Sequence, residues 1–246
     1  MVFSKIKSVF TERKERQVSR NLRLVKNAKA IREDRWAALE YFKHHQDPTI
    51  AVPALLDRFE YSLEHGINDT REKEMALEGI LGHKDAAVPI LQERLTATTR
   101  IAWPIKALKA MGNEKLIIDS LLGALNFNDV AFDQGQVDKN YDVLCYLRDH
   151  KVPDSVPQLA HFLKDPDERV RFACIEFLLE QDHPDLPNLV EPFLSDASSE
   201  NLRLRQAAIE AFGGRQWKVK DVSKFPGGNV VGPIFVNQEG KLVRRG

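Results

Sequence analysis

The residue types that most often carry enzyme chemistry or bind metals are few in this chain and are not grouped. Among 246 residues there are seven histidines and two cysteines, Cys145 and Cys174. No His-Glu-x-x-His or Cys-x-x-Cys spacing occurs, so the sequence does not predict a metal site. The pair Gly227-Gly228 lacks the Lys-Ser or Lys-Thr of a phosphate loop, and no Gly-x-Ser-x-Gly motif is present. We therefore expect no catalytic residue, metal, cofactor or small-molecule substrate.

Structural roles explain the histidines and cysteines better. Six of the seven histidines fall at predicted helix ends, where an imidazolium is compatible with the negative end of the helix dipole. Cys145 and Cys174 fall at core or near-core positions of predicted helices, which favours buried thiols. Two cysteines do not suggest a disulfide framework, and no apolar run approaches the roughly 20 residues of a bilayer-spanning helix. The N-terminus does not read as a secretory signal, so we predict a cytoplasmic protein.

The elements that position side chains in this chain are predicted from an internal repeat. A pattern of one small residue, one apolar residue, two variable residues and one apolar residue recurs six times. Successive copies start 31 to 38 residues apart, and they occupy residues 38–42, 76–80, 107–111, 143–147, 174–178 and 208–212. Apolar residues spaced three and four apart lie on one face of a helix. The small residue would let a neighbouring helix approach closely.

A second pattern lies between these copies and predicts a second helix in each unit. It reads Val-Pro-x-Leu or a close variant at residues 52–55, 88–91, 156–159 and 186–189, with a copy lacking proline at 118–121. Each proline fits the first turn of a helix, where the missing N–H would have no partner. Because one helix pair cannot bury its apolar face alone, we expect the pairs to stack. The predicted fold is all-α, an α-solenoid of about six helical hairpins.

Two segments carry a family resemblance. Asp-Pro-Asp-Glu-Arg-Val-Arg at 165–171, followed by Cys174 and Leu178, is similar to the HEAT consensus, and so is Leu-Arg-Gln-Ala-Ala at 204–208 with Phe212 and Gly213. In that family an arginine opens the first helix and an alanine follows three residues later. The chain resembles the short bacterial HEAT proteins with phycobilin-lyase-like repeats over about residues 32–214. The resemblance implies a binding surface, and some HEAT-like proteins act as bilin lyases or DNA glycosylases.

The charges divide the chain into three segments. Residues 1–35 carry a net charge of +7 and residues 215–246 carry +5, whereas the repeats between them carry −12. We expect a basic helical arm or cap at 1–31, the repeats at 32–214 and a basic tail at 215–246. The apolar residues Val2, Phe3, Ile6, Val9 and Phe10 share a predicted helical face, which favours a cap on the repeats. The alternative is an arm that binds nucleic acid or an anionic membrane.

The tail and the tryptophans are assigned structural roles. Residues 234–236 and 241–243 flank the turn residues 237–240, which predicts a small β-hairpin. We expect this hairpin to fold back on the last repeat, and the alternative is that it adds a strand to a partner. Trp36 and Trp103 are predicted to pack between helices, and Trp217 is predicted to hold the tail.

The second helices are expected to line the binding side of the stack. Their polar positions are Asp57, Arg58, Glu60, Gln92, Glu93, Asp119, Ser120, Gln158 and Asn188. This set leans acidic, so its expected ligand is a basic segment of a partner protein. The long polar connection at residues 126–140 is a further candidate for a specific contact.

The sequence thus predicts a non-catalytic scaffold or adaptor that binds a partner protein on the repeat surface. One alternative is a helical-repeat protein that binds nucleic acid through its basic termini, although the charge of −12 on the repeats disfavours it. A second alternative is a HEAT-like enzyme such as a bilin lyase, for which the sequence shows no acid–base set.

Overall fold

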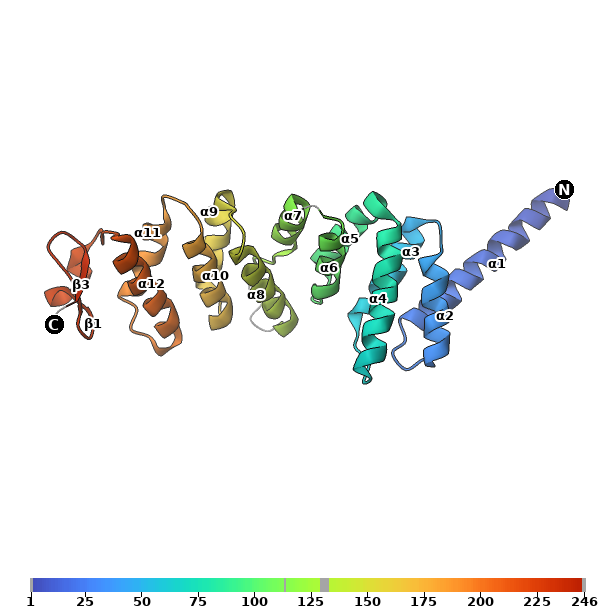
Figure 1. Ribbon diagram of the computed structural model, residues 1–246, viewed down its shortest axis with the longest axis horizontal. Helices are drawn as coiled ribbons and strands as arrows, with labels where there is room; N and C mark the ends of the chain where they lie inside the picture. Colours follow the sequence, from blue (N-terminus) through green and yellow to red (C-terminus); the bar gives the residue numbers. More distant parts are fainter. Residues whose placement is uncertain (1, 113, 129–132, 245–246) are drawn as a thin grey trace. The chain divides into compact units, whose positions relative to one another are not determined.

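The chain is mostly helical and separates into two compact units. The computed structural model describes residues 2–112, 114–128 and 133–244, with side chains from residue 12 onward. Twelve α-helices and one small antiparallel sheet lie in this described part (Figure 1). The first unit comprises Met1–Ala124 and the second Leu125–Gly246. The division between them falls inside the predicted repeat region.

The first unit is built from seven helices. They are α1 (Val2–Val25), α2 (Arg32–Lys43), α3 (Pro48–Asp57), α4 (Gly66–Gly82), α5 (Val88–Ala97), α6 (Ala102–Ala110) and α7 (Glu114–Ala124). The first helices of the pairs pack in order, α2 on α4 and α4 on α6. The second helices do the same, α3 on α5 and α5 on α7. The second half of α1 packs on α2 and α3, and its Val25 is fully buried.

The second unit is built from five helices and the sheet. The helices are α8 (Gln134–Arg148), α9 (Val156–Leu159), α10 (Glu168–Glu180), α11 (Leu186–Val190) and α12 (Leu202–Arg215). Helix α10 packs against both α8 and α12. The short helices α9 and α11 continue as 3-10 turns at Ala160–Lys164 and Glu191–Leu194. Within the described residues, α12 is followed by two 3-10 turns, Val222–Lys224 and Pro226–Gly228, and then by the sheet, without a second α-helix.

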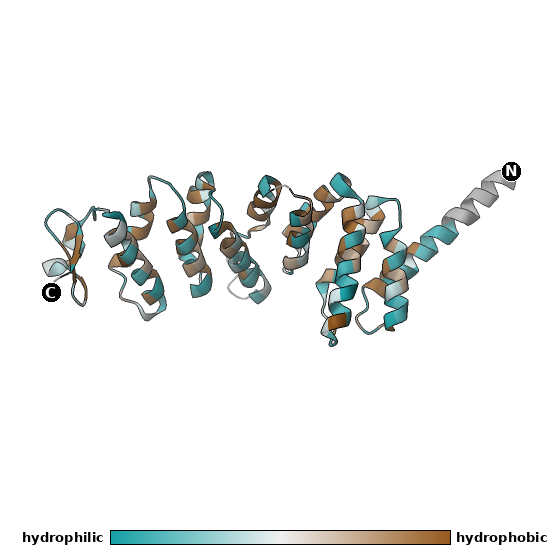
Figure 2. Cartoon of the chain, viewed as in Figure 1, coloured by the Kyte–Doolittle hydropathy of each residue, from teal (hydrophilic) through white to brown (hydrophobic). Residues whose placement is uncertain are grey.

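The first repeat pattern lies in a first helix at every copy. Its leading residue has no solvent exposure in any of the six copies, which are Ala38, Ala76, Ala107, Val143, Cys174 and Ala208. Figure 2 shows the apolar residues concentrated where helices of the same unit face each other. A small side chain at this position brings neighbouring helices together, because close packing leaves no room for a larger one.

Aspartates fix the starts of several helices. The side chains of Asp47, Asp133 and Asp167 accept hydrogen bonds from the backbone N–H groups of the first turns of α3, α8 and α10. The prolines of α5, α9 and α11 lie in the first turn, as predicted. Pro53 is an exception. Because Asp47 caps α3 and the helix begins at Pro48, Pro53 lies inside the helix.

One register position of the first helices holds a polar side chain in five of the six copies. It lies three residues before each copy of the first pattern and holds Arg35, Lys73, Asn140, Arg171 and Arg205, with Pro104 in α6. Arg171 donates to the carbonyls of Asp165 and Pro166 at 2.8 and 2.9 Å, and Arg205 donates to that of Leu194 at 3.2 Å. Arg35, Asn140, Arg171 and Arg205 therefore tie the segment before their helix to the helix itself. The hydrogen bonds of the three arginines are charge-assisted and worth about 1.5–3 kcal/mol each.

The predicted β-hairpin is present and has a third strand. Strand β2 (Ile234–Val236) pairs with β3 (Leu242–Arg244), and β1 (Asn229–Val231) pairs with the other edge of β2. The sequence analysis missed β1 because its three residues follow Pro226-Gly227-Gly228, which reads as a loop. The sheet folds back on the last helix, since β3 packs on α12 and Arg205 donates to the Val230 carbonyl.

Three further expectations need correction. The connection predicted at 126–140 ends at Asp133, because Asp133 caps α8 and residues 134–140 are helical; residues 129–132 of it lie outside the described part. His65 is at the N-terminus of α4, the positive end of the dipole, whereas His44 and His83 follow C-termini as predicted. Cys145 is only half-buried.

The side chains of Val2, Phe3, Ile6, Val9 and Phe10, which carry the predicted apolar face, lie outside the described residues. None of the helices that the structure describes combines the length and the apolar composition that crossing a bilayer requires.

Candidate partner-binding surface

The residues predicted to line a binding side fall in both units. Asp57, Arg58, Glu60, Gln92, Glu93, Asp119 and Ser120 belong to the first unit, and Gln158 and Asn188 to the second. Glu93, Asp119, Gln158 and Asn188 are exposed. Gln92 is half-buried and its side-chain amide donates to the Ser120 hydroxyl at 3.0 Å.

The two carboxylates at the end of α3 are already neutralised. Arg94 lies 2.8 Å from Asp57 and 3.1 Å from Glu60, and Lys26 lies 3.2 Å from the other oxygen of Asp57. The Thr98 hydroxyl donates to Glu60 at 2.9 Å. Since Arg94 belongs to α5 and Lys26 is the residue directly after α1, the acidic character that the sequence predicts at Asp57 and Glu60 is compensated within the unit.

Arg58 is not part of an accessible surface, which corrects its inclusion in the predicted set. Its side chain is 0% exposed and lies 2.8 Å from Glu72 and 2.7 Å from Asp69. Glu72 also accepts from Arg35 at 2.9 Å, and Asp69 from Lys73 at 2.7 Å. The five charges form one buried ionic cluster, which we call the α4 cluster. Arg58 is buried there because a desolvated guanidinium needs these carboxylates as partners.

Within the α4 cluster, Asp69 has an altered acidity. Burial alone would raise the pKa of this carboxyl group, but hydrogen bonds from Lys73, Arg58 and the Leu63 backbone outweigh it. The pKa of Asp69 is therefore held below its ordinary value, and the group stays ionised at neutral pH.

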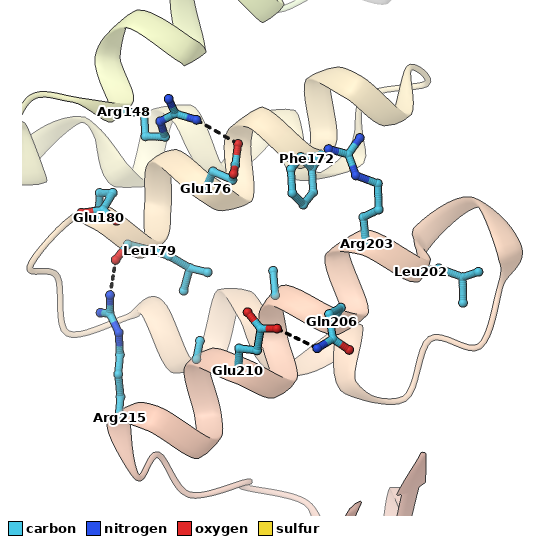
Figure 3. Close-up of a pocket in the computed structure, with 12 residues that line it drawn as sticks. Arg148, Phe172, Glu176, Leu179, Glu180, Leu202, Arg203, Gln206, Glu210 and Arg215 are labelled. Atoms are coloured by element: carbon cyan, nitrogen blue, oxygen red, sulfur yellow. Dashed lines mark hydrogen bonds and ion pairs between the residues drawn. The ribbon is translucent and has the colours of Figure 1, made fainter. Parts of the chain in front are cut away.

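One groove of the second unit lies between two of its first helices. A cavity of about 670 Å³ opens between α10 and α12, with Arg148 of α8 at its margin (Figure 3). Its apolar surface comes from Phe172, Leu179, Leu202, Ala207 and Ala211. Leu202 is 57% exposed and adds accessible apolar surface to this lining. We call this cavity the α10–α12 groove.

The charged residues of the α10–α12 groove are arranged by sign. Arg203 and Arg215 lie at the two ends of α12, and Glu210 and Glu176 lie between them. Arg148 pairs with Glu176 at 3.1 Å. Arg215 donates to the Leu179 carbonyl, as Figure 3 shows. The groove therefore has an apolar floor, cationic ends and an acidic middle.

Arg203 packs against an aromatic ring in the groove. Its guanidinium lies 3.7 Å from the centroid of the Phe172 ring, and the two side chains are adjacent in Figure 3. The neighbouring helix pair repeats this contact, with Arg169 of α10 at 5.8 Å from the Tyr141 ring of α8. The aromatic residue lies two residues before one copy of the repeat pattern, and the arginine five residues before the next.

The same register occurs in the first unit with Trp36 and Arg71. These two residues line a smaller cavity of about 380 Å³ between α2 and α4. Trp36 is 38% exposed, so the prediction that it packs between helices is wrong. The sequence analysis missed these aromatic and arginine positions, although their fixed distance from the repeat pattern was a signal that could have found them.

The thiols do not provide a reactive group in this surface. Cys174 is fully buried and contacts the Leu159 carbonyl oxygen at 3.2 Å, and burial raises its pKa well above the ordinary value. Burial likewise raises the pKa of the half-buried Cys145. In the described part of the chain, no three His, Cys, Asp or Glu side chains are grouped so that they could hold a metal ion.

Comparisons with protein-family models, with curated proteins and with solved structures give no match to this chain.

Proposed function

We propose that this protein is a non-catalytic interaction module of the HEAT type, which binds a partner protein on the surface of its first helices. Three observations support the repeat assignment. Six fully buried leading residues recur at a spacing of 31 to 38 residues, the first helices pack in order within each unit, and a loop-tying polar side chain recurs at one register position. An α-solenoid is the arrangement that such units form when they stack.

The α10–α12 groove is the proposed binding site, and its occupant is an amphipathic helix of the partner. Arg203 and Arg215 are twelve residues apart in α12, which is about 18 Å along its axis and matches about twelve residues of a bound helix. The exposed apolar floor, including Leu202, fits the apolar face of such a helix. The charges call for acidic residues toward the ends of the bound helix and a basic residue near its middle.

The charge balance of the groove favours protein over nucleic acid as the ligand. Three carboxylates, Glu176, Glu180 and Glu210, line it together with three arginines. A phosphate backbone would meet these carboxylates as well as the arginines, and like-charge contacts oppose its binding.

Site-specific photocrosslinking in cells that naturally express the protein tests this proposal. Benzoylphenylalanine in place of Gln206 probes the groove, and the same residue in place of Gln158, on the second helix α9, probes the side that the sequence predicted. We expect a protein adduct from position 206, with the crosslinked peptide in an amphipathic helix, and loss of that adduct in Arg203→Glu.

Three results would contradict the proposal: an adduct from position 158 alone, an adduct with nucleic acid, or no adduct from position 206. Circular dichroism of the Arg203→Glu variant serves as the folding control. Arg203 is exposed, so the circular dichroism spectrum of the Arg203→Glu variant is expected to match that of the unaltered chain.

A further inference from the structure

The cavity between α2 and α4 differs in charge from the α10–α12 groove. Its lining residues are Arg32, Glu33, Trp36 and Ala37 of α2, and Asn68, Arg71 and Glu72 of α4. Two exposed isoleucines adjoin this lining in the chain, Ile31 and Ile67, which are 67% and 73% exposed. An exposed aromatic ring and two arginines thus line one cavity, and two exposed aliphatic residues are next to lining residues in the sequence. We call it the Trp36 pocket.

Glu72, the carboxylate at the back of the Trp36 pocket, is paired with two arginines. Glu72 accepts from Arg35 at 2.9 Å through one oxygen and from Arg58 at 2.8 Å through the other. The α4 cluster as a whole contains three cations, Arg35, Arg58 and Lys73, against Glu72 and Asp69. A net positive charge is therefore buried directly behind the pocket.

Cations also exceed carboxylates at the mouth of the pocket. Glu33 pairs with Arg32 at 3.0 Å, which leaves Arg71 as the remaining charge. The Arg71 side chain is exposed, and its guanidinium has no ion pair or hydrogen bond with the described residues of the chain. An arginine beside an aromatic ring presents a planar set of donors that matches a carboxylate, and the low polarity of the ring strengthens that contact.

We propose that the Trp36 pocket binds an acidic segment of a partner protein, in which a carboxylate adjoins a large apolar side chain. The carboxylate pairs with the Arg71 guanidinium, and the apolar side chain packs on the Trp36 ring and the exposed isoleucines. The excess positive charge of the α4 cluster favours this anion over a neutral or basic segment.

A single-stranded nucleic acid also combines anions with stacking groups, but the pocket fits it less well. Sequence-tolerant strand binding uses successive aromatic side chains along a basic groove. Here one tryptophan is accompanied by aliphatic Ile31 and Ile67, which suit aliphatic or aromatic side chains of a protein. This site lies in the first unit and is independent of the α10–α12 groove.

Selection from a random peptide library displayed on phage, against the full-length protein, tests the proposal. We expect the selected peptides to be enriched in Asp or Glu next to Leu, Ile, Phe or Trp. A synthetic copy of a selected peptide should shift the indole N–H signal of Trp36 in the nitrogen-15 spectrum, which Trp36→Phe identifies among the three tryptophans.

Two substitutions distinguish binding in the Trp36 pocket from nonspecific attraction between charges. Arg71→Glu should weaken binding of that peptide at least about tenfold, because it removes a charge-assisted pair and adds repulsion. Arg20→Glu makes the same charge change at an exposed residue of α1 that does not line the pocket, and it should leave the affinity within about twofold of the unaltered protein, because salt screens charges that are not in direct contact with the ligand.

Several outcomes would overturn the proposal. They are a selection without acidic enrichment, a selection that yields no binder, equal loss of affinity in Arg71→Glu and Arg20→Glu, and a Trp36 indole signal that responds to a single-stranded oligonucleotide but to no selected peptide. None of these results depends on the photocrosslinking at position 206, so the two sites can fail separately.

Discussion

The first-helix surfaces of the two units use one register but differ in what lies beneath them. Trp36 and Arg71 in the first unit correspond to Phe172 and Arg203 in the second. Four residues before the repeat pattern, however, α4 has Glu72 and α12 has Leu204, and both are fully buried. At this buried position, the first unit thus has an ionic interior and the second unit an apolar one.

The loop-tying arginines show the consequence of this difference. Arg35 extends to the Glu72 carboxylate, whereas Arg171 donates to the Asn201 side-chain oxygen at 2.9 Å. Both guanidiniums are satisfied, but one depends on a charged acceptor and the other on neutral ones. Removing the acceptor should therefore cost much more in the first unit than in the second, because an uncompensated buried charge is the larger penalty.

The largest effect is expected for Glu72→Gln. This change leaves Arg35 and Arg58 buried with Asp69 as the only carboxylate of the α4 cluster, and we expect a loss of about 3–5 kcal/mol in the free energy of unfolding. Chemical denaturation of the full chain measures it. The matched change Asn201→Ala in the second unit should cost only about 0.5–1.5 kcal/mol. Equal losses for the two variants would remove the contrast between the units.

A smaller effect is expected where α2 and α4 approach each other. A Cβ atom at Gly79 would lie 2.6 Å from a Leu55 methyl carbon and 3.1 Å from the Lys43 Cα. Gly79→Ala should therefore destabilise the protein by about 1–3 kcal/mol despite the better helix propensity of alanine. Gly213 of α12 has open space around it, so Gly213→Ala should stabilise by up to about 1 kcal/mol. Thermal unfolding should show shifts of opposite sign.

Helix capping supplies a third and still smaller comparison. Asp167 accepts from the Arg169 backbone N–H at 2.8 Å at the start of α10, and Asp47 accepts from that of Thr49 at 2.9 Å at the start of α3. Alanine at either position should cost about 1 kcal/mol. Since both are N-caps, denaturant midpoints should move by similar amounts in the two variants. A much larger shift for one of them would show that its aspartate has a role beyond capping.

The smallest expected effect is the contribution of Asp69, in the first unit, to the pH dependence of stability. Because the pKa of Asp69 is lower in the folded chain than in the unfolded one, its contribution to stability is fully present above the ordinary aspartate pKa. It is lost as the pH falls through the lowered value. Asp69→Asn should flatten the acid side of the stability profile, as measured by urea unfolding between neutral pH and about pH 3. An unchanged acid slope would contradict this assignment.

The sequence predicted the helices well because their apolar spacing is local information. The buried leading residues such as Ala38 and Ala208, and the first-turn prolines such as Pro89, follow from patterns within one or two helical turns. The helix start at Asp133 was missed because the mostly polar residues 134–140 read as a loop, although Val137, Lys139 and Asn140 among them are buried side chains of α8.

The ionic cluster and the exposed ring could not be predicted in the same way. Arg35 and Glu72 are 37 residues apart, and Arg58 and Glu72 are 14 apart, so no local pattern joins them. Arg58 was assigned to the accessible side because it is a polar position of a predicted second helix, whereas its carboxylate partners lie in α4. Trp36 was assigned a packing role, whereas it is 38% exposed and lines the cavity between α2 and α4.

The contact between the last repeat arginine and the sheet also bears on self-association. Arg205 donates to the Val230 carbonyl of β1. Arg171, at the same register position of α10, donates instead to the side chain of Asn201, just before α12. In the first unit, the second half of α1 covers α2 and α3 in a comparable way. Stacked helix pairs whose terminal apolar faces were bare would add further copies end to end and grow into filaments. Among the described residues, β3 packs on α12 and α1 packs on α2 and α3, and both contacts reduce the apolar surface on which a second molecule could stack.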